Sequence, residues 1–402
     1  MIITPSSRAG ALCESVTLAV TARAAALRRQ GVDIIGFGAG EPDFDTPEFI
    51  RDAAKAALDA GQTRYTPTPS YPELRSAISE KLQRENSLNY SPRQISVGAG
   101  GKFCLFAAFL AVIDPGDEVL IPSPHWVSYP QQVLLAGGIP RFVRAEESAG
   151  FKLTPEQLDS AISDRTRVLV LNSPCNPTGQ VYSRAELAAL ADVVAGHPRV
   201  VVFSDEIYEK FIYGDAQFTS FASLRSDLLE RVLVFNCHSK SFAMTGWRVG
   251  YVAGPQPIID AINNVVSHTI SHITSFCQMP AATALTDPRG REGIQRMRAE
   301  FEKRGQRMWS RLNELPGITC LRPQGAFYCF PNINAYLGTR VDETKITDAV
   351  SFADSLLEHA HVAVVPGNDS GFPTHIRLSF ATGMEQIDEG IDRIEKFLSR
   401  LR

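Results

Sequence analysis

The sequence predicts an α/β protein, with one large domain whose mostly parallel sheet is covered by helices and a second, smaller α/β domain. Two observations predict this fold. Between residues 95 and 237, short strands that are apolar throughout alternate with helical segments, which is typical of parallel strands buried on both faces. The chain also has 402 residues, too many for one ordinary core, so a second domain is expected.

The composition excludes several classes of function. The net charge is −4 and no basic run is interleaved with aromatic residues, so we expect no nucleic-acid partner. No apolar run reaches membrane-spanning length and the start lacks the pattern of a signal peptide, so we expect a soluble, cytoplasmic protein with no membrane partner. Seven cysteines without a C-x-x-C pair favour reduced core thiols, and we predict no metal site.

The first 90 residues are expected to contain three helices and one short strand: helices over residues 15–31, 47–60 and 72–86, and a strand over residues 32–37. Gly38 and Gly40 follow this strand, and they either let the backbone approach a ligand closely or form an ordinary turn. A proline-rich loop between the second and third helices presents Tyr65.

The middle of the chain alternates strands over residues 95–98, 118–123, 168–173, 200–206 and 232–237 with helices over residues 100–113, 125–137 and 183–195. A further strand and one long helical region are expected over residues 249–253 and 256–316. Short strands then accompany helices over residues 345–360 and 385–401. We therefore divide the chain into an N-terminal arm with part of the small domain, the large domain, and the rest of the small domain, over residues 1–45, 46–299 and 300–402.

Ligands of open α/β sheets bind beyond the carboxyl ends of the strands, and here several strand ends carry chemically capable residues. Gly100, Gly101 and Lys102 open a helix directly after the first strand of the sheet. Free N–H groups and the positive end of the helix dipole predict a phosphate site there, although the spacing is neither that of a P-loop nor that of a dinucleotide fold. Asn176 lies in a proline-rich turn that either holds hydrogen-bonding groups rigidly or is an ordinary loop.

Two further strand ends carry a carboxylate and an amine. Asp205 extends an apolar strand, where an ionised carboxylate requires a cation such as a protonated pyridine nitrogen or an arginine in a structural ion pair. Lys240 follows Ser239 in a turn at the end of the next strand, and burial there would lower its pKa and make it a nucleophile toward carbonyl compounds. Arg248 follows eight residues later.

These residue types form the set that pyridoxal phosphate requires: an amine for a Schiff base, an aspartate for the pyridine nitrogen, and glycine amides with an arginine for the phosphate. The sequence therefore predicts this cofactor. Trp126 either stacks on a cofactor ring or belongs to the core. Arg377, on a strand of the small domain, either binds a substrate carboxylate or forms a structural ion pair.

A series of motifs carries a resemblance along the chain: GEPDFDTP, RYTP, GGK, IDPGDEVLIPSPHWVSYP, NSPCNPTG, SDEIYEKFIY, SKSFAMTGWRVGY, GAFY, VAVVPG and IRLSFA. In this order and at these spacings, the chain resembles the class I (fold-type I) pyridoxal-phosphate-dependent aminotransferases over essentially its whole length. It is most similar to the bacterial and archaeal aspartate aminotransferase subgroup.

The resemblance implies a role for each site residue. Lys240 would carry the cofactor and move the substrate proton. Further cofactor contacts would come from Gly100, Gly101, Lys102, Trp126, Asn176, Asp205, Tyr208, Ser239, Arg248 and, from a neighbouring subunit, Tyr65. The substrate would meet Gly40, Trp126, Asn176, Arg377, Lys102 and Ser15. The family works as a homodimer with its sites at the subunit interface, so a homodimer is expected.

Four departures from the family pattern stand out. Ser70 replaces a usual glycine, Cys237 replaces a small hydroxyl residue or glycine three positions before Lys240, and residues 267–278 lack a Ser/Thr-Asn-Pro pattern. Members that also transaminate prephenate resemble one another in an N-terminal lysine, and Cys13 occupies that place here. We therefore do not expect activity on prephenate.

The resemblance implies transamination between L-aspartate and 2-oxoglutarate, giving oxaloacetate and L-glutamate by a ping-pong exchange. Lys102 of the GGK motif favours dicarboxylic substrates on the same grounds. Three alternatives remain: an aminotransferase with aromatic or broad specificity, a lyase that uses the same cofactor, and a non-enzymatic sensor that binds it.

Overall fold

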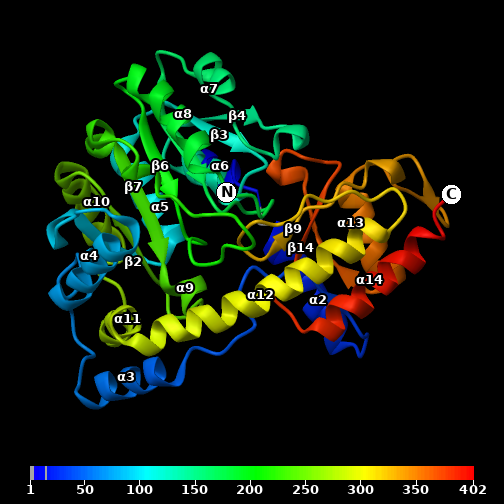
Figure 1. The fold of residues 1–402 in the computed structure, drawn as a ribbon, viewed down its shortest axis with the longest axis horizontal. Helices are drawn as coiled ribbons and strands as arrows, with labels where there is room; N and C mark the ends of the chain where they lie inside the picture. The colour runs from blue at the N-terminus through cyan, green and yellow to red at the C-terminus, as the bar shows by residue number, and fades with distance from the viewer. Residues whose placement is uncertain (1–3, 14–15) are drawn as a thin grey trace.

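The computed structural model describes residues 4–13 and 16–402. Figure 1 shows a large domain built around a twisted sheet and a smaller domain beside it, with the long helix α12 (Pro288–Glu314) running from one to the other. None of the helices among the described residues is long and apolar enough to cross a membrane.

The large domain contains a seven-stranded sheet in the order β2-β8-β7-β6-β5-β3-β4. Its strands are β2 (Ile95–Ala99), β3 (Glu118–Ser123), β4 (Ile139–Arg144), β5 (Thr166–Asn172), β6 (Val201–Asp205), β7 (Val232–Cys237) and β8 (Val249–Ala253). Only β8 runs antiparallel to its neighbours, because β7 and β8 are joined by a short turn rather than by a crossover helix. The predicted mostly parallel sheet is confirmed.

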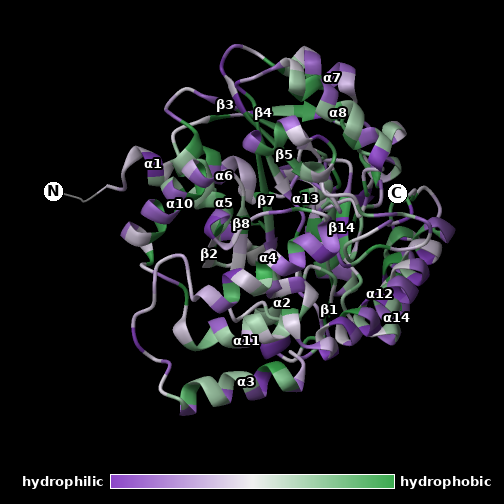
Figure 2. Cartoon of the chain, turned by 60° about the vertical axis from the view of Figure 1, so that its left-hand side comes forward, coloured by the Kyte–Doolittle hydropathy of each residue, from purple (hydrophilic) through white to green (hydrophobic). Residues whose placement is uncertain are grey.

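Helices cover both faces of this sheet, and the strands send alternate residues to the two sides. On β6, Val202 packs into one apolar cluster and Phe203 into the other. One side is covered by α5 (Gly101–Val112), α6 (Ser128–Leu135) and α10 (Gln256–Thr269), and the other by α4 (Pro72–Asn86), α7 (Pro155–Ala161), α8 (Arg184–Gly196) and α11 (Ser275–Thr286). Figure 2 accordingly shows hydrophobic strands enclosed between helices of mixed polarity.

The predicted helical region over residues 256–316 is wrong as a single element, since it consists of the three separate helices α10, α11 and α12. Ser271 has a φ of 63°, a left-handed conformation that a continuous helix cannot contain. Asp287 then caps α12, with Pro288 at its first position. The edge strand β4 was not predicted, because most of its residues are exposed and its sequence lacks an apolar pattern.

The small domain combines the two ends of the chain. Strand β1 (Ile35–Gly36) pairs in parallel with β12 (Val362–Ala363), and a three-stranded antiparallel sheet has the order β13-β14-β9. The remaining elements are α2 (Val16–Arg29), β9 (Tyr328–Cys329), β10 (Arg340–Val341), β11 (Thr344–Lys345), α13 (Ala349–Ala360), β13 (Val365–Pro366), β14 (Ile376–Ser379) and α14 (Met384–Leu398).

The long helix α12 belongs to both domains. Ile294, near its start, packs against an apolar cluster that includes Ile50 of α3 (Glu48–Asp59), whereas Phe301 and Leu312 belong to the core of the small domain. We propose that the domain boundary lies within this helix, near residues 299 and 300. Tyr208 from the large domain lies in the same apolar cluster as Phe301, so the core continues across the boundary.

Candidate active site

A cavity of about 340 Å³ lies at the carboxyl edge of the central sheet and is closed by the small domain. Eight residues that the sequence singled out line it: Gly40, Lys102, Trp126, Asn176, Asp205, Tyr208, Lys240 and Arg377. The sheet alignment explains this convergence, because Asn172 at the end of β5 and Asp205 at the end of β6 are direct neighbours in register.

Lys240 lies in the four-residue helix α9 (His238–Ser241), directly after the buried strand β7. Its ammonium group donates a hydrogen bond to the carbonyl oxygen of Gly40, and no carboxylate pairs with it among the described residues. Burial lowers the pKa of Lys240, while Cys237 and Glu41 act in the opposite direction. The lowered pKa favours the neutral amine, which is the nucleophilic form.

Asp205 ends β6 and is 1% exposed. Within residues 4–13 and 16–402 no arginine or lysine forms an ion pair with it; the hydroxyl of Tyr129 donates a hydrogen bond to its Oδ2 atom instead. Burial raises the pKa of Asp205 to about 6, although the bond from Tyr129 acts in the opposite direction. The predicted alternative of a structural arginine is therefore absent, and the carboxylate is available to a cationic ligand atom.

A group of donors suited to phosphate lies beside the cavity. Helix α5 starts at Gly101, so its first N–H groups lack partners within the helix. Gly100 has a φ of 83°, and a Cβ atom there would lie 2.5 Å from Nη2 of Arg248. Arg248 itself donates to the carbonyl oxygen of Thr245 at 3.0 Å and to that of Ala99 at 3.2 Å. A glycine is thus required for the guanidinium group to lie against the start of the helix.

Arg377 projects from β14 and is 5% exposed. Its Nη1 atom donates to Oδ1 of Asn176 at 3.0 Å and its Nη2 atom donates to the carbonyl oxygen of Gly38 at 2.9 Å. Its Nε atom is buried without a partner, and no carboxylate pairs with Arg377 in the described part of the chain. A buried arginine with unused donor capacity is suited to a carboxylate ligand.

Two tyrosines to which the sequence analysis gave no role, Tyr129 and Tyr328, complete the site. The hydroxyl groups of Tyr208 and Tyr328 are 2.8 Å apart, and the ring of Tyr328 lies 4.6 Å from the Cζ atom of Arg377. Tyr129 connects Asp205 to Trp126, whose ring centroid is 5.2 Å away in an edge-to-face arrangement. The motifs GAFY and PHWVSYP contain both tyrosines, but a tyrosine within an apolar pattern looks like an ordinary core residue.

Residues 32–394 match the family Aminotransferase class I and II. The chain belongs to this family. The aminotransferase is 48% identical to the aspartate/prephenate aminotransferase of Cereibacter sphaeroides, over 96% of both chains, and 45% identical to the aspartate aminotransferase of Geobacillus stearothermophilus, over 98% of both. The solved structure of the aspartate aminotransferase from Rhizobium meliloti superimposes with a TM-score of 0.95 at 41% identity, over 100% of both chains.

The predicted family and cofactor are confirmed, since aminotransferases of this family depend on pyridoxal phosphate. The residues of this aminotransferase also fit the cofactor on structural grounds. Among the described residues, the buried carboxylate of Asp205 and the partly buried amine of Lys240 form no ion pair, and the start of α5 offers free N–H groups. Asp205 fits the pyridine nitrogen of the cofactor, Lys240 fits its aldehyde, and the start of α5 fits its phosphate.

The structure places two predicted residues of the aminotransferase, Tyr65 and Ser239, away from the cavity wall. Tyr65 is 91% exposed and lies edge-to-face against His272, with ring centroids 5.6 Å apart. Ser239 is buried within α9 and does not line the cavity. Ser15 lies outside the described residues. The roles of these residues, and the contact of Tyr65 with a neighbouring subunit, stay predictions.

The departures from the family pattern have local structural accounts. Ser70 has a φ of 93°, in the left-handed region that favours the glycine it replaces. Within residues 267–278, Gln278 accepts a hydrogen bond from the backbone N–H of Tyr71 at 2.7 Å and donates one to Thr66 at 3.0 Å, so this segment supports the proline-rich loop by its own contacts. Cys237 is buried, and its backbone N–H donates to Oδ1 of Asn236 at 2.8 Å.

Proposed function

We propose that this aminotransferase transfers the amino group of L-aspartate to 2-oxoglutarate, giving oxaloacetate and L-glutamate in two half-reactions. The observation that carries the proposal is that one cavity contains three groups without an ion pair in the described part of the chain: the partly buried amine of Lys240, the buried carboxylate of Asp205 and the buried guanidinium of Arg377. The curated relatives named as aspartate aminotransferases support the choice of substrate.

When bound, pyridoxal phosphate supplies an electron-accepting ring that weakens the Cα–H bond of an amino acid. Asp205 would keep the pyridine nitrogen protonated, because a buried carboxylate without a cation is stabilised by a positive charge. The start of α5 and Arg248 would hold the phosphate, with Lys102 and Ser239 nearby.

Arg377 would bind the α-carboxylate of the substrate, and its fixed contacts with Asn176 and Gly38 orient the guanidinium group before the substrate arrives. Lys240 would take the proton from Cα of the amino acid and deliver it to the cofactor. The lowered pKa of Lys240 favours the neutral amine, which is the form that a general base requires. Arg377 is buried and Lys240 is partly buried, so the groups around them limit the access of water to the proton transfer.

Lys102 would recognise the distal carboxylate of aspartate. Its ammonium group lies 5.1 Å from the ring centroid of Trp126 and lines the cavity, and its pKa is lowered by burial and by Arg248. A cation at this position favours dicarboxylic over apolar amino acids.

We also propose that the enzyme is a cytoplasmic homodimer. Tyr65, 91% exposed at the tip of a proline-rich loop, is suited to contact a second copy. Its side chain would then reach the phosphate of that copy, as the family resemblance implies. In the described part of the chain all seven cysteines are free and six are buried, which supports a reducing compartment.

Steady-state kinetics with aspartate, aromatic amino acids, alanine and branched amino acids as donors to 2-oxoglutarate test the substrate. We expect aspartate to have the highest kcat/KM and glutamate to form stoichiometrically. A strong aromatic preference with negligible turnover of aspartate would overturn the aspartate assignment. That outcome would agree with the aromatic aminotransferase of Pyrococcus horikoshii, whose solved structure superimposes with a TM-score of 0.86 at 41% identity, over 93% of this chain and 98% of that one.

A further inference from the structure

A second cavity, of about 770 Å³, lies behind the catalytic lysine. Helix α9 contributes to both cavities: Lys240 lines the catalytic one, whereas His238 and Ser241 line the second. The other walls come from α4, from the end of α11 and from the start of α12. Nothing in the proposed transamination uses this cavity.

The inner wall of the second cavity holds two polar atoms without partners. Asn236 is 2% exposed and His238 is 1% exposed, and both residues line the cavity. Oδ1 of Asn236 accepts the N–H of Cys237, but its Nδ2 donor has no acceptor. Nε2 of His238 lies 3.0 Å from the carbonyl oxygen of Ala281 and must be the protonated nitrogen, which leaves Nδ1 as an acceptor without a donor.

Unpartnered buried polar atoms are costly, so this pair favours a ligand group that both accepts and donates a hydrogen bond. Burial lowers the pKa of His238 to about 4, so the ring is neutral at neutral pH and keeps its acceptor. A hydroxyl group meets both requirements, because its oxygen accepts from Asn236 while its proton is donated to His238.

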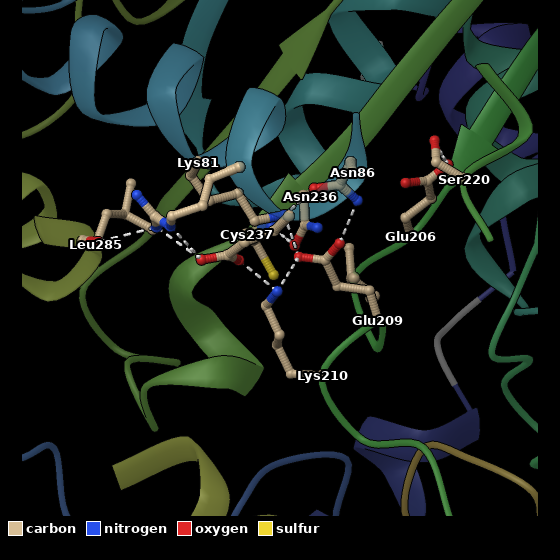
Figure 3. A network of polar contacts seen from close by, with 12 residues as sticks. Lys81, Asn86, Glu206, Glu209, Lys210, Ser220, Asn236, Cys237 and Leu285 are labelled. Carbon is tan, nitrogen blue, oxygen red and sulfur yellow. Dashed lines mark hydrogen bonds and ion pairs between the residues drawn. The ribbon is translucent and has the colours of Figure 1, made fainter. Parts of the chain in front are cut away.

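The charged residues of the lining divide into paired and unpaired groups. Glu209 contacts Lys81 and Lys210, and Glu85 contacts Arg84 and Lys210, so these charges are compensated (Figure 3). In the same lining, three exposed residues on α12 have no ion pair or hydrogen bond among the described residues: Arg291, Glu292 and Arg298. Two free cations against one free anion leave a single net positive charge, which suits a monoanion.

The two arginines are suited to act together, since a spacing of seven residues places both on one side of α12. Guanidinium groups bind carboxylates through parallel hydrogen bonds. Besides its polar residues, the lining includes the apolar side chains of Phe242, Leu285 and Ile294. The body of a ligand would therefore be apolar or aromatic.

We propose that the second cavity binds a small aromatic monocarboxylic acid with a hydroxyl group at its far end. The carboxylate contacts Arg291 and Arg298, the ring packs between Phe242, Leu285 and Ile294, and the hydroxyl group bonds to Asn236 and His238. Because His238 and Lys240 share the four-residue helix α9, the ligand occupies the reverse side of the segment that carries the catalytic amine.

Isothermal titration calorimetry of the holoenzyme with para-hydroxyphenylacetate tests this proposal, with phenylacetate as the matched probe that lacks the hydroxyl group. We expect para-hydroxyphenylacetate to bind, and phenylacetate to bind several-fold more weakly. The double substitution Arg291→Gln/Arg298→Gln should weaken binding about tenfold or more. Arg296→Gln is the control on the same helix, because Arg296 is exposed and does not line the cavity.

The variant Arg377→Ala distinguishes binding in this cavity from binding in the catalytic cavity, because a carboxylate probe in the catalytic cavity would require Arg377. We expect it to bind para-hydroxyphenylacetate like the unchanged enzyme, whatever amino acid the enzyme prefers as donor. Loss of binding in Arg377→Ala, unchanged affinity in the double arginine variant, or no binding to the unchanged enzyme would each overturn the proposal.

Discussion

Two lysines, Lys81 on α4 and Lys240 on α9, have different electrostatic surroundings. The side chain of Lys81 is 3% exposed and forms an ion pair with Glu209, whose side chain is 2% exposed, and a hydrogen bond with Asn86 at 2.8 Å. Lys240 is partly buried, and its ammonium group donates a hydrogen bond to the carbonyl oxygen of Gly40 but contacts no carboxylate among the described residues. The first lysine thus has a carboxylate partner among the described residues, and the second does not.

Two buried carboxylates, Glu209 and Asp205, differ in the same way. Burial would raise the pKa of Glu209, but Lys210 and Lys81 outweigh it and lower that pKa to about 2. Asp205 has no such cation, and burial raises its pKa to about 6. Two similarly buried carboxyl groups thus have pKa values shifted in opposite directions. The difference indicates where a ligand is required. The ion-paired cluster around Glu209 stabilises the fold, whereas Asp205 and Lys240 are completed by a cofactor.

The largest expected effect is a difference in turnover between variants of Lys240 and variants of Lys81. Lys240→Ala should lower the rate of transamination by about 10³-fold or more, because the base for the proton transfer is lost. The free energy of unfolding of the cofactor-free protein should be unchanged or higher, since an unpaired buried amine is removed. Lys81→Met should show the reverse pattern, with most of the turnover retained and stability reduced. Initial rates and urea denaturation measure the two effects, and similar losses of turnover in both variants would contradict the comparison.

The compensated cluster should be sensitive to the loss of one partner. Glu209→Gln leaves Lys81 buried without its anion, and we expect the free energy of unfolding to fall by about 3–5 kcal/mol. The double substitution Lys81→Met/Glu209→Leu removes both charges and should recover most of that loss. Urea denaturation of both variants measures this, and a double variant as unstable as Glu209→Gln would show that the charges themselves are not the cause.

The uncompensated carboxylate should make stability depend on pH. The pKa of Asp205 is about 6 in the folded protein against 3.8 in the unfolded chain, so the folded state holds its proton more tightly. The cofactor-free protein should therefore lose about 3 kcal/mol of stability as the pH rises from about 4 through about 6. Asp205→Asn should remove this dependence, and saturation with the cofactor should reduce it. Equal pH profiles for the unchanged protein and Asp205→Asn would contradict the assignment.

The smallest expected effect concerns Lys102, which lies at the exposed side of the catalytic cavity. Lys102→Gln should raise the KM for aspartate about tenfold and leave the KM for alanine nearly unchanged, because only aspartate has a distal carboxylate. Parallel measurements with both donors are required. A proportional change for both would assign Lys102 to the cofactor alone.

Much of the catalytic cavity could be predicted from the sequence, because its polar residues directly follow apolar strands. Asn176, Asp205 and Lys240 each come after a strand of the sheet, and parallel strands bring such ends together. Gly100 was also found by its place before a helix, although the close approach of Arg248 that requires it depends on the antiparallel strand β8.

Other features depend on packing that a sequence pattern does not contain. Tyr328 and Arg377 come from the small domain, and their contacts with Tyr208 and Asn176 form only when the domains pack together. The second cavity was not foreseen either. Arg298 belongs to a charged helical run typical of a solvated face, and that face becomes a cavity wall only because α12 packs against α11 while α4 contributes another wall.

The most direct test of the central claim is the visible absorbance spectrum of the purified enzyme, titrated with pH and then with aspartate. We expect a cofactor band that responds to pH and shifts on addition of aspartate, and we expect both responses to disappear in Lys240→Ala. The absence of a visible band from the unchanged enzyme, or a band that Lys240→Ala leaves unaltered, would contradict the assignment of Lys240 as the residue that carries the cofactor.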